Sequence, residues 1–89
     1  MLEKVKVALR IKTRHFDVEL ADLIEAAKID LGIAGVEVPD EYDAIITRAI
    51  ITYCKMSFGL PEDYDILKKS YDEQKAQLSN ASGYTKWEA

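Results

Sequence analysis

The sequence is poor in the residues that make covalent staples or metal sites. Its 89 residues include one cysteine and one histidine. Cys54 therefore has no partner for an internal disulfide, and His15 has no cysteine or second histidine at the spacing of a metal site. No nucleophile stands beside a base in the way that covalent catalysis needs. We expect no catalytic, metal or cofactor site and no enzyme activity.

Long apolar runs are absent too. No uncharged apolar stretch approaches the roughly 20 residues that a membrane-spanning helix needs, and the first residues do not have the pattern of a secretory signal. We therefore expect a cytoplasmic protein without a membrane partner. Because 48% of the residues are hydrophobic and 31% are charged, we expect one compact soluble domain rather than a disordered chain.

The charges are unevenly distributed. The chain has 12 Lys and Arg against 16 Asp and Glu, a net charge of −4. Residues 1–15 nevertheless hold five basic side chains against Glu3 alone, so this part carries +4 and the remainder −8. The basic strip consists of Lys4, Lys6, Arg10, Lys12 and Arg14. It could face DNA phosphates or an acidic protein surface, or it could be an ordinary solvated helix and loop.

Hydrophobic periodicity predicts helices and no useful strand. The segments are residues 2–10, 17–31, 40 to the stop at Gly59 and Pro61, and 61 or 63 to 78. We expect Asp17 and Asp40 to cap the second and third helices and Gly32 to end the second in the left-handed conformation. The predicted fold is all-α, a small bundle of about four short helices at residues 1–78 with a flexible aromatic tail at 79–89.

The expected core lies on one face of each helix. In the second helix it is Leu20, Leu23, Ile24, Ala27 and Leu31. In the third, the wide face of Tyr42, Ile45, Ile46, Ala49, Ile50, Tyr53 and Cys54 predicts the central helix. In the fourth, Tyr64, Leu67, Tyr71 and Leu78 follow heptad-like spacing, with Gln74 in an apolar place.

Two further features are candidate interfaces. Glu19, Asp22 and Glu25 recur every three residues and form either an acidic docking stripe or a solvated helix face. Tyr84 and Trp87 follow the last helix. These aromatics either order on a partner or fold back onto their own domain.

The order of these patterns resembles one family. The first half reads Leu2-x-x-Val5-Lys6-x-x-Leu9-Arg10-Ile11, then Asp17-x-x-Leu20-x-x-Leu23-Ile24-x-Ala26-Ala27 and Asp30-Leu31. The second half reads Ile45-Ile46-x-x-Ala49-Ile50-x-x-Tyr53 and Phe58-Gly59, with a final helix through Tyr71. Over about residues 2–78 the chain resembles the small head-tail connector, or adaptor, proteins of tailed bacteriophages and prophages. Members commonly have two acids at the start of the second helix, where this chain has Phe16 and Asp17.

The resemblance implies a structural protein of the virion neck rather than an enzyme. Such a protein forms a ring on the portal, expected to be twelve-fold, which extends the DNA channel and joins capsid to tail after packaging. Its partners would be its own copies, the portal and the next head-completion or tail protein, with DNA only passing through the channel. It would be assembled in the cytoplasm of the bacterial host.

The resemblance also suggests roles for the candidate surfaces. The basic strip would face the channel or a neighbouring subunit, the acidic stripe a neighbouring subunit, and the tail the portal or the next ring. A small helical DNA-binding or regulatory module is the alternative, because helices with short turns and a basic strip are its minimum requirements. The overall acidity of the chain argues against that alternative.

Overall fold

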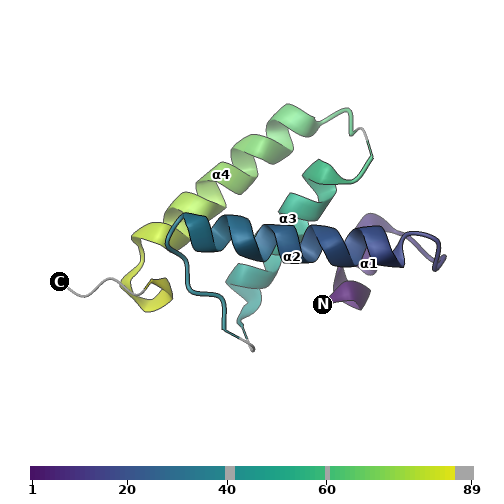
Figure 1. The fold of residues 1–89 in the computed structure, drawn as a ribbon. Helices are drawn as coiled ribbons and strands as arrows, with labels where there is room; N and C mark the ends of the chain where they lie inside the picture. Colours follow the sequence, from purple (N-terminus) through teal and green to yellow (C-terminus); the bar gives the residue numbers. More distant parts are fainter. Residues whose placement is uncertain (40–41, 60, 86–89) are drawn as a thin grey trace.

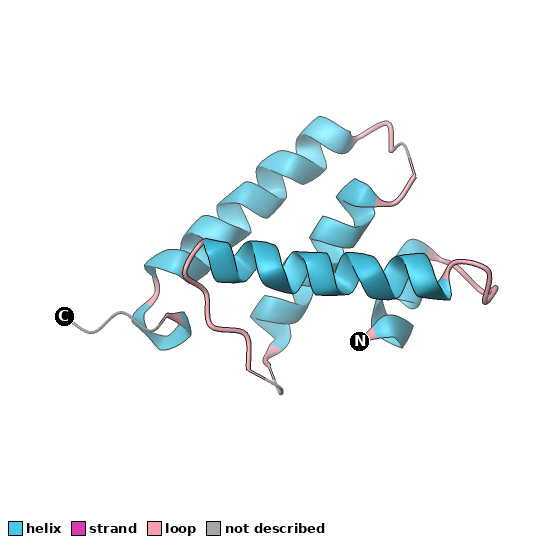
Figure 2. Ribbon diagram, in the orientation of Figure 1, coloured by secondary structure: helices cyan, strands magenta, loops and turns pink. Residues whose placement is uncertain are grey.

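The computed structural model describes residues 1–39, 42–59 and 61–85. It contains four α-helices, α1 (Leu2–Leu9), α2 (Asp17–Ile33), α3 (Ala44–Ser57) and α4 (Tyr64–Asn80), followed by a 3-10 turn, η1 (Ser82–Tyr84). Short loops join the helices, and the described residues form no strand (Figure 2). The prediction of an all-α bundle of four helices is confirmed.

Helix α3 is the centre of the fold. It lies behind α2 and beside α4, and α1 lies behind the first half of α2 (Figure 1). Helix α3 contacts each of the other three helices, as its wide apolar face predicts. Ala49, Ile50 and Cys54 of α3 have no exposed surface, and Ile46 has 2%. Ile45 is 52% exposed, so its predicted place in the core is wrong.

Helix α2 buries the face that its periodicity predicts, and α4 buries only part of its predicted face. Leu20, Ile24, Ala27 and Leu31 of α2 are buried, and Leu23 is partly buried against them. Helix α4 contributes fewer buried side chains, Tyr71 and Leu78, while Leu67 and Gln74 are half-buried and Tyr64 is exposed. The core is therefore built mainly by α2 and α3, and α4 covers one side of it.

The caps at two helix starts differ from the sequence predictions. Helix α3 begins at Ala44, and its cap is Asp43, whose Oδ1 accepts from the backbone N–H groups of Ile45 at 3.0 Å and Ile46 at 3.2 Å. Asp40, the predicted cap, lies outside the described residues. Helix α2 begins at Asp17 itself, which makes no side-chain cap. Its carboxylate is oriented toward a lysine of α1 instead, so the predicted capping role of Asp17 is wrong.

Two helix ends also lie beyond their predicted positions. Helix α2 continues through Gly32 to Ile33, and Gly35 rather than Gly32 adopts the left-handed conformation, with φ of 91°. Helix α4 runs to Asn80, two residues past the predicted end at Leu78. Gly59, with φ of 70°, follows α3 and ends it as predicted.

A polar cluster ties α2 to α4. The Tyr71 hydroxyl donates to Asp30 Oδ2 at 2.6 Å, and Lys75 Nζ donates to the same oxygen at 3.2 Å. The Tyr71 ring also meets Tyr53 of α3 edge-on, with centroids 5.3 Å apart. Burial raises the pKa of Asp30, but its bonds to Tyr71 and Lys75 outweigh burial and hold the pKa below the usual 3.8.

We predict that this cluster makes the fold sensitive to acid. Because the pKa of Asp30 is lowered on folding, its stabilising effect is complete above pH 3.8 and is lost as the pH falls through the lower folded-state pKa. Asp30→Asn should lower the free energy of unfolding at neutral pH by about 1 kcal/mol, a modest loss because the carboxylate is partly exposed. Urea titrations should show this difference shrinking below pH 3.8.

Asp72→Asn on α4 is the matched control for Asp30→Asn. Asp72 pairs with Lys68 at 3.1 Å on the exposed side of α4, so its neutralisation should change stability little. A deficit of Asp30→Asn that stays constant from neutral to acid pH would contradict the assigned role of the Asp30 carboxylate.

Candidate functional site

The side chains most often used in catalysis, those of Cys54 and His15, are not arranged as an active site in the described structure. Cys54 is completely buried, and burial raises its pKa to about 11, so its thiol is neutral and inaccessible. His15 lies exposed in the α1–α2 loop. Within residues 1–39, 42–59 and 61–85 no three His, Cys, Asp or Glu side chains gather as a metal site would require.

An open hollow lies beside the C-terminal turn. It has a volume of about 300 Å³ and is lined by residues of the α2–α3 loop and η1, among them Glu37, Tyr42, Asp43 and Tyr84. Asp43 is already engaged there, because one oxygen caps α3 and the other accepts from the Tyr84 hydroxyl. The bonds from the Tyr84 hydroxyl and from the backbone N–H groups of Ile46 and Ile45 outweigh desolvation and hold the pKa of Asp43 below its usual value.

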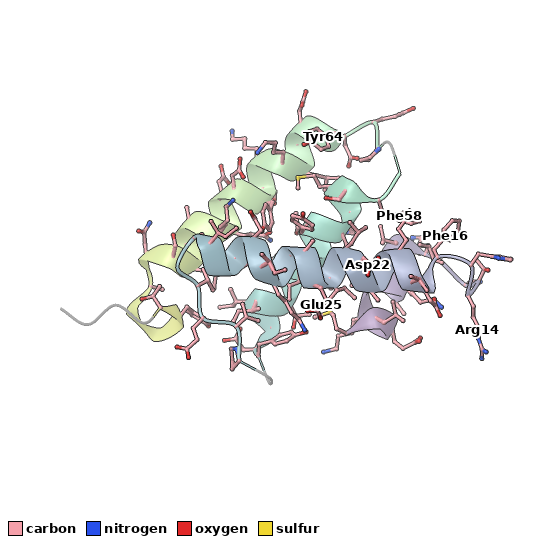
Figure 3. All side chains as sticks on the ribbon, viewed as in Figure 1. Arg14, Phe16, Asp22, Glu25, Phe58 and Tyr64 are labelled. Atoms are coloured by element: carbon pink, nitrogen blue, oxygen red, sulfur yellow. The ribbon has the colours of Figure 1, made fainter. Side chains whose placement is uncertain are left out.

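The basic strip is not one continuous exposed surface. Lys4, Arg10, Lys12 and Arg14 are exposed, and Arg14 points outward from the α1–α2 loop (Figure 3). Lys6 instead has a side chain only 10% exposed, with its Nζ 2.8 Å from Asp17 Oδ1 of α2. The two groups form an ion pair whose geometry is not that of a hydrogen bond. Lys6 therefore holds α1 against α2.

The acidic stripe lies on the outer side of α2. Glu19, Asp22 and Glu25 are all exposed, and Asp22 and Glu25 lie on the side of α2 that faces the viewer in Figure 3. Glu25 pairs weakly with Lys28 at 3.4 Å. The predicted placement of these acids on one helix is therefore realised, while their role in docking stays a prediction.

Sequence reasoning missed a second apolar row on the same side of α2. Val18 is 77% exposed, Ile29 64% and Ile33 81%. The spacing of these residues, eleven and then four, returns to the same direction on a helix of 3.6 residues per turn. The spacing of this second row is present in the sequence, but the row beginning at Leu20 has more apolar residues and is the one that periodicity predicts to be buried.

The C-terminal segment packs on its own domain as far as it is described. Tyr84 is partly buried against the core, its carbonyl accepts from the backbone N–H of Glu37 at 2.7 Å, and Thr85 makes an isolated bridge with Val36. Of the two interpretations of the tail aromatics, folding back onto their own domain is therefore the one that holds for Tyr84. Trp87, the other aromatic of the predicted docking tail, lies outside the described residues.

We predict that the Lys6–Asp17 pair stabilises the fold as a unit. Asp17→Asn leaves the ammonium of Lys6 buried without its counter-charge and should lower the free energy of unfolding by about 1 kcal/mol. Lys6→Met together with Asp17→Asn should recover most of that loss, since an apolar side chain suits the site. Urea unfolding of the two single variants and the double variant measures the coupling.

Lys4→Met is the control for the Lys6–Asp17 pair, because Lys4 is on the same helix and exposed. It should lie within about 0.5 kcal/mol of the unchanged protein. Strictly additive effects of Lys6→Met and Asp17→Asn would show that the two side chains do not interact.

Fold and surfaces together define a small all-α protein whose distinguishing features are exposed charged and apolar helix faces. The family model described as "Phage connector protein" matches residues 1–85, and the chain belongs to that family. Searches of curated proteins and of solved structures found no match. None of the described helices is long and apolar enough to cross a membrane. The family indicates a phage connector role.

Proposed function

We propose that this chain is a structural protein of the virion neck that assembles as a ring on the portal, extends the DNA channel and joins capsid to tail after packaging. The match of residues 1–85 to the phage connector family is the observation that carries this proposal. Its partners are further copies of the chain, twelve in register with the portal, the portal itself and the next head-completion or tail protein. The chain acts without catalysis.

The charge of the chain is compatible with a channel that lets DNA pass. A net charge of −4 opposes tight, nonspecific binding of a polyanion. Four exposed cations, Lys4, Arg10, Lys12 and Arg14, remain for contacts with the channel contents or a neighbouring subunit. Lys6 is not available for such contacts because it pairs with Asp17 inside the domain.

The family match does not favour the alternative of a DNA-binding or regulatory module. The two functions differ in their salt dependence. A DNA-binding module should bind duplex at physiological salt with affinity that falls steeply as salt rises, whereas a connector should not hold DNA tightly.

We predict that phage lacking this chain produces full heads without attached tails, seen by electron microscopy of lysates. The connector would be missing from the portal vertex, and the tail would have no platform to join. Expression of the unchanged chain from a plasmid is the control and should restore tailed, infectious particles. Complete, infectious particles made without the chain would contradict the proposed function.

We also propose that the C-terminal tail contacts the portal or the next ring through residues beyond Tyr84, because Tyr84 is already partly buried on its own domain. Truncation after Thr85 keeps the contacts of Tyr84 and removes Trp87. The truncated chain should unfold at the same temperature as the full chain, by circular dichroism, but should fail to restore tailed particles.

Truncation after Ser79 is the contrasting variant. It also removes η1 and the bond from Tyr84 to Asp43, so it should lower the unfolding temperature. Full complementation by the chain truncated after Thr85 would refute docking through residues 86–89.

A further inference from the structure

The outer side of α2 has exposed apolar side chains as well as the acidic stripe. Val18, Ile29 and Ile33 are 77%, 64% and 81% exposed and lie on the same side of α2. The opposite side, with Leu20, Ile24 and Leu31, is buried in the core. Ile29 and Ile33 are one helical turn apart, and adjacent exposed apolar side chains on a helix favour contact with a partner. Within the described residues, only one side of α2 is covered.

Carboxylates interrupt this outer apolar row. By helical spacing, Asp22 lies between Val18 and Ile29, and Glu25 lies beside the row. The carboxylate of Glu25 forms an exposed ion pair with Lys28 Nζ, and the two atoms are 3.4 Å apart. The outer face of α2, defined by Val18, Asp22, Glu25, Ile29 and Ile33, thus has apolar side chains toward its two ends and negative charge between them. A complementary partner would be apolar and positively charged.

The outer face of α1 has these properties. Val7 is 77% exposed. Lys4 and Arg10 are exposed on either side of Val7 along the chain, and the α1–α2 loop adds exposed Lys12 and Arg14. Glu3, four residues before Val7, is the one exposed acid of α1 and lies on the same side. The outer face of α1, defined by Glu3, Lys4, Val7, Arg10, Lys12 and Arg14, therefore has an exposed apolar side chain and a net positive charge, which complements the negative outer face of α2.

The two outer faces belong to opposite sides of the α1–α2 pair. Helix α1 lies behind the first half of α2 (Figure 1). Val5 and Lys6 of α1 are buried and Val7 is 77% exposed, so Val7 lies on the side of α1 away from the core. The outer face of α2 points away from α3, toward the viewer. One chain cannot bring its own two faces together, but two copies can do so front to back. Such a contact is heterologous and can repeat until a ring closes.

We propose that the outer face of α2 binds the outer face of α1 on a second copy of this chain. This inference rests on the proposed ring. It identifies the contact that forms the ring as an apolar row of Val18, Ile29 and Ile33 against Val7, with Asp22 and Glu25 near the cations of the neighbouring copy. The apolar contacts supply affinity, and the charges between them set orientation.

Purified chain and neutral polar substitutions test this contact. One variant, Ile29→Gln with Ile33→Gln, impairs the α2 face; another, Val7→Gln, impairs the α1 face. All three positions are exposed, so circular dichroism should show unchanged folding. Ile66→Gln is the matched control, because Ile66 is 72% exposed on α4, outside both faces.

Sedimentation velocity across a concentration series should show self-association of the unchanged chain and of Ile66→Gln. Each face variant should associate at least about tenfold more weakly. Mixing the two face variants should give a 1:1 complex, because one retains an intact α2 face and the other an intact α1 face. Neither variant alone should form that complex.

Three results would overturn the inference. The unchanged chain could remain monomeric up to about 1 mM, the weak end of specific association. Val7→Gln could associate as well as the unchanged chain, which would indicate contacts between two α2 faces. Ile66→Gln could weaken association as much as the face variants. Each result leaves the connector role standing, because that role is tested separately by the tails of particles lacking the chain.

Discussion

Burial of α3 between α2 and α4 is the contact on which the rest of this structure depends. Ala49, Ile50 and Cys54 are removed from solvent entirely by helices on two sides. A domain of 89 residues buries a smaller share of its surface than a larger one and is correspondingly less stable. Loss of volume at these positions would therefore affect every helix at once, since α1, α2 and α4 all pack on α3.

Polar contacts fix how the outer helices lie on that core. Lys6 and Asp17 join α1 to α2, Asp30 and Tyr71 join α2 to α4, and Asp43 joins the start of α3 to Tyr84. These contacts lie at different edges of the core. They give α2 a defined position with one side free, and that free side is where its carboxylates and second apolar row meet solvent.

Sequence periodicity was sufficient for the fold class, the number of helices and most of the core, because those depend on apolar spacing within each helix. Helix caps were harder. Asp40 and Asp43 both have cap chemistry, and the choice depends on which backbone N–H groups become free, which tertiary structure decides. Burial of Lys6 could not be predicted either. From the sequence alone, a lysine near a helix start is expected to be solvated. Lys6 is buried because the tertiary position of α2 places Asp17 beside it.

The most direct measurement is a high-resolution reconstruction of the virion neck by cryo-electron microscopy. The account predicts copies of this chain in a closed ring at the portal, with α2 of each copy against α1 of the next and no covalent link between them. A neck from which this chain is absent would contradict the central claim that it works as a building block of that junction.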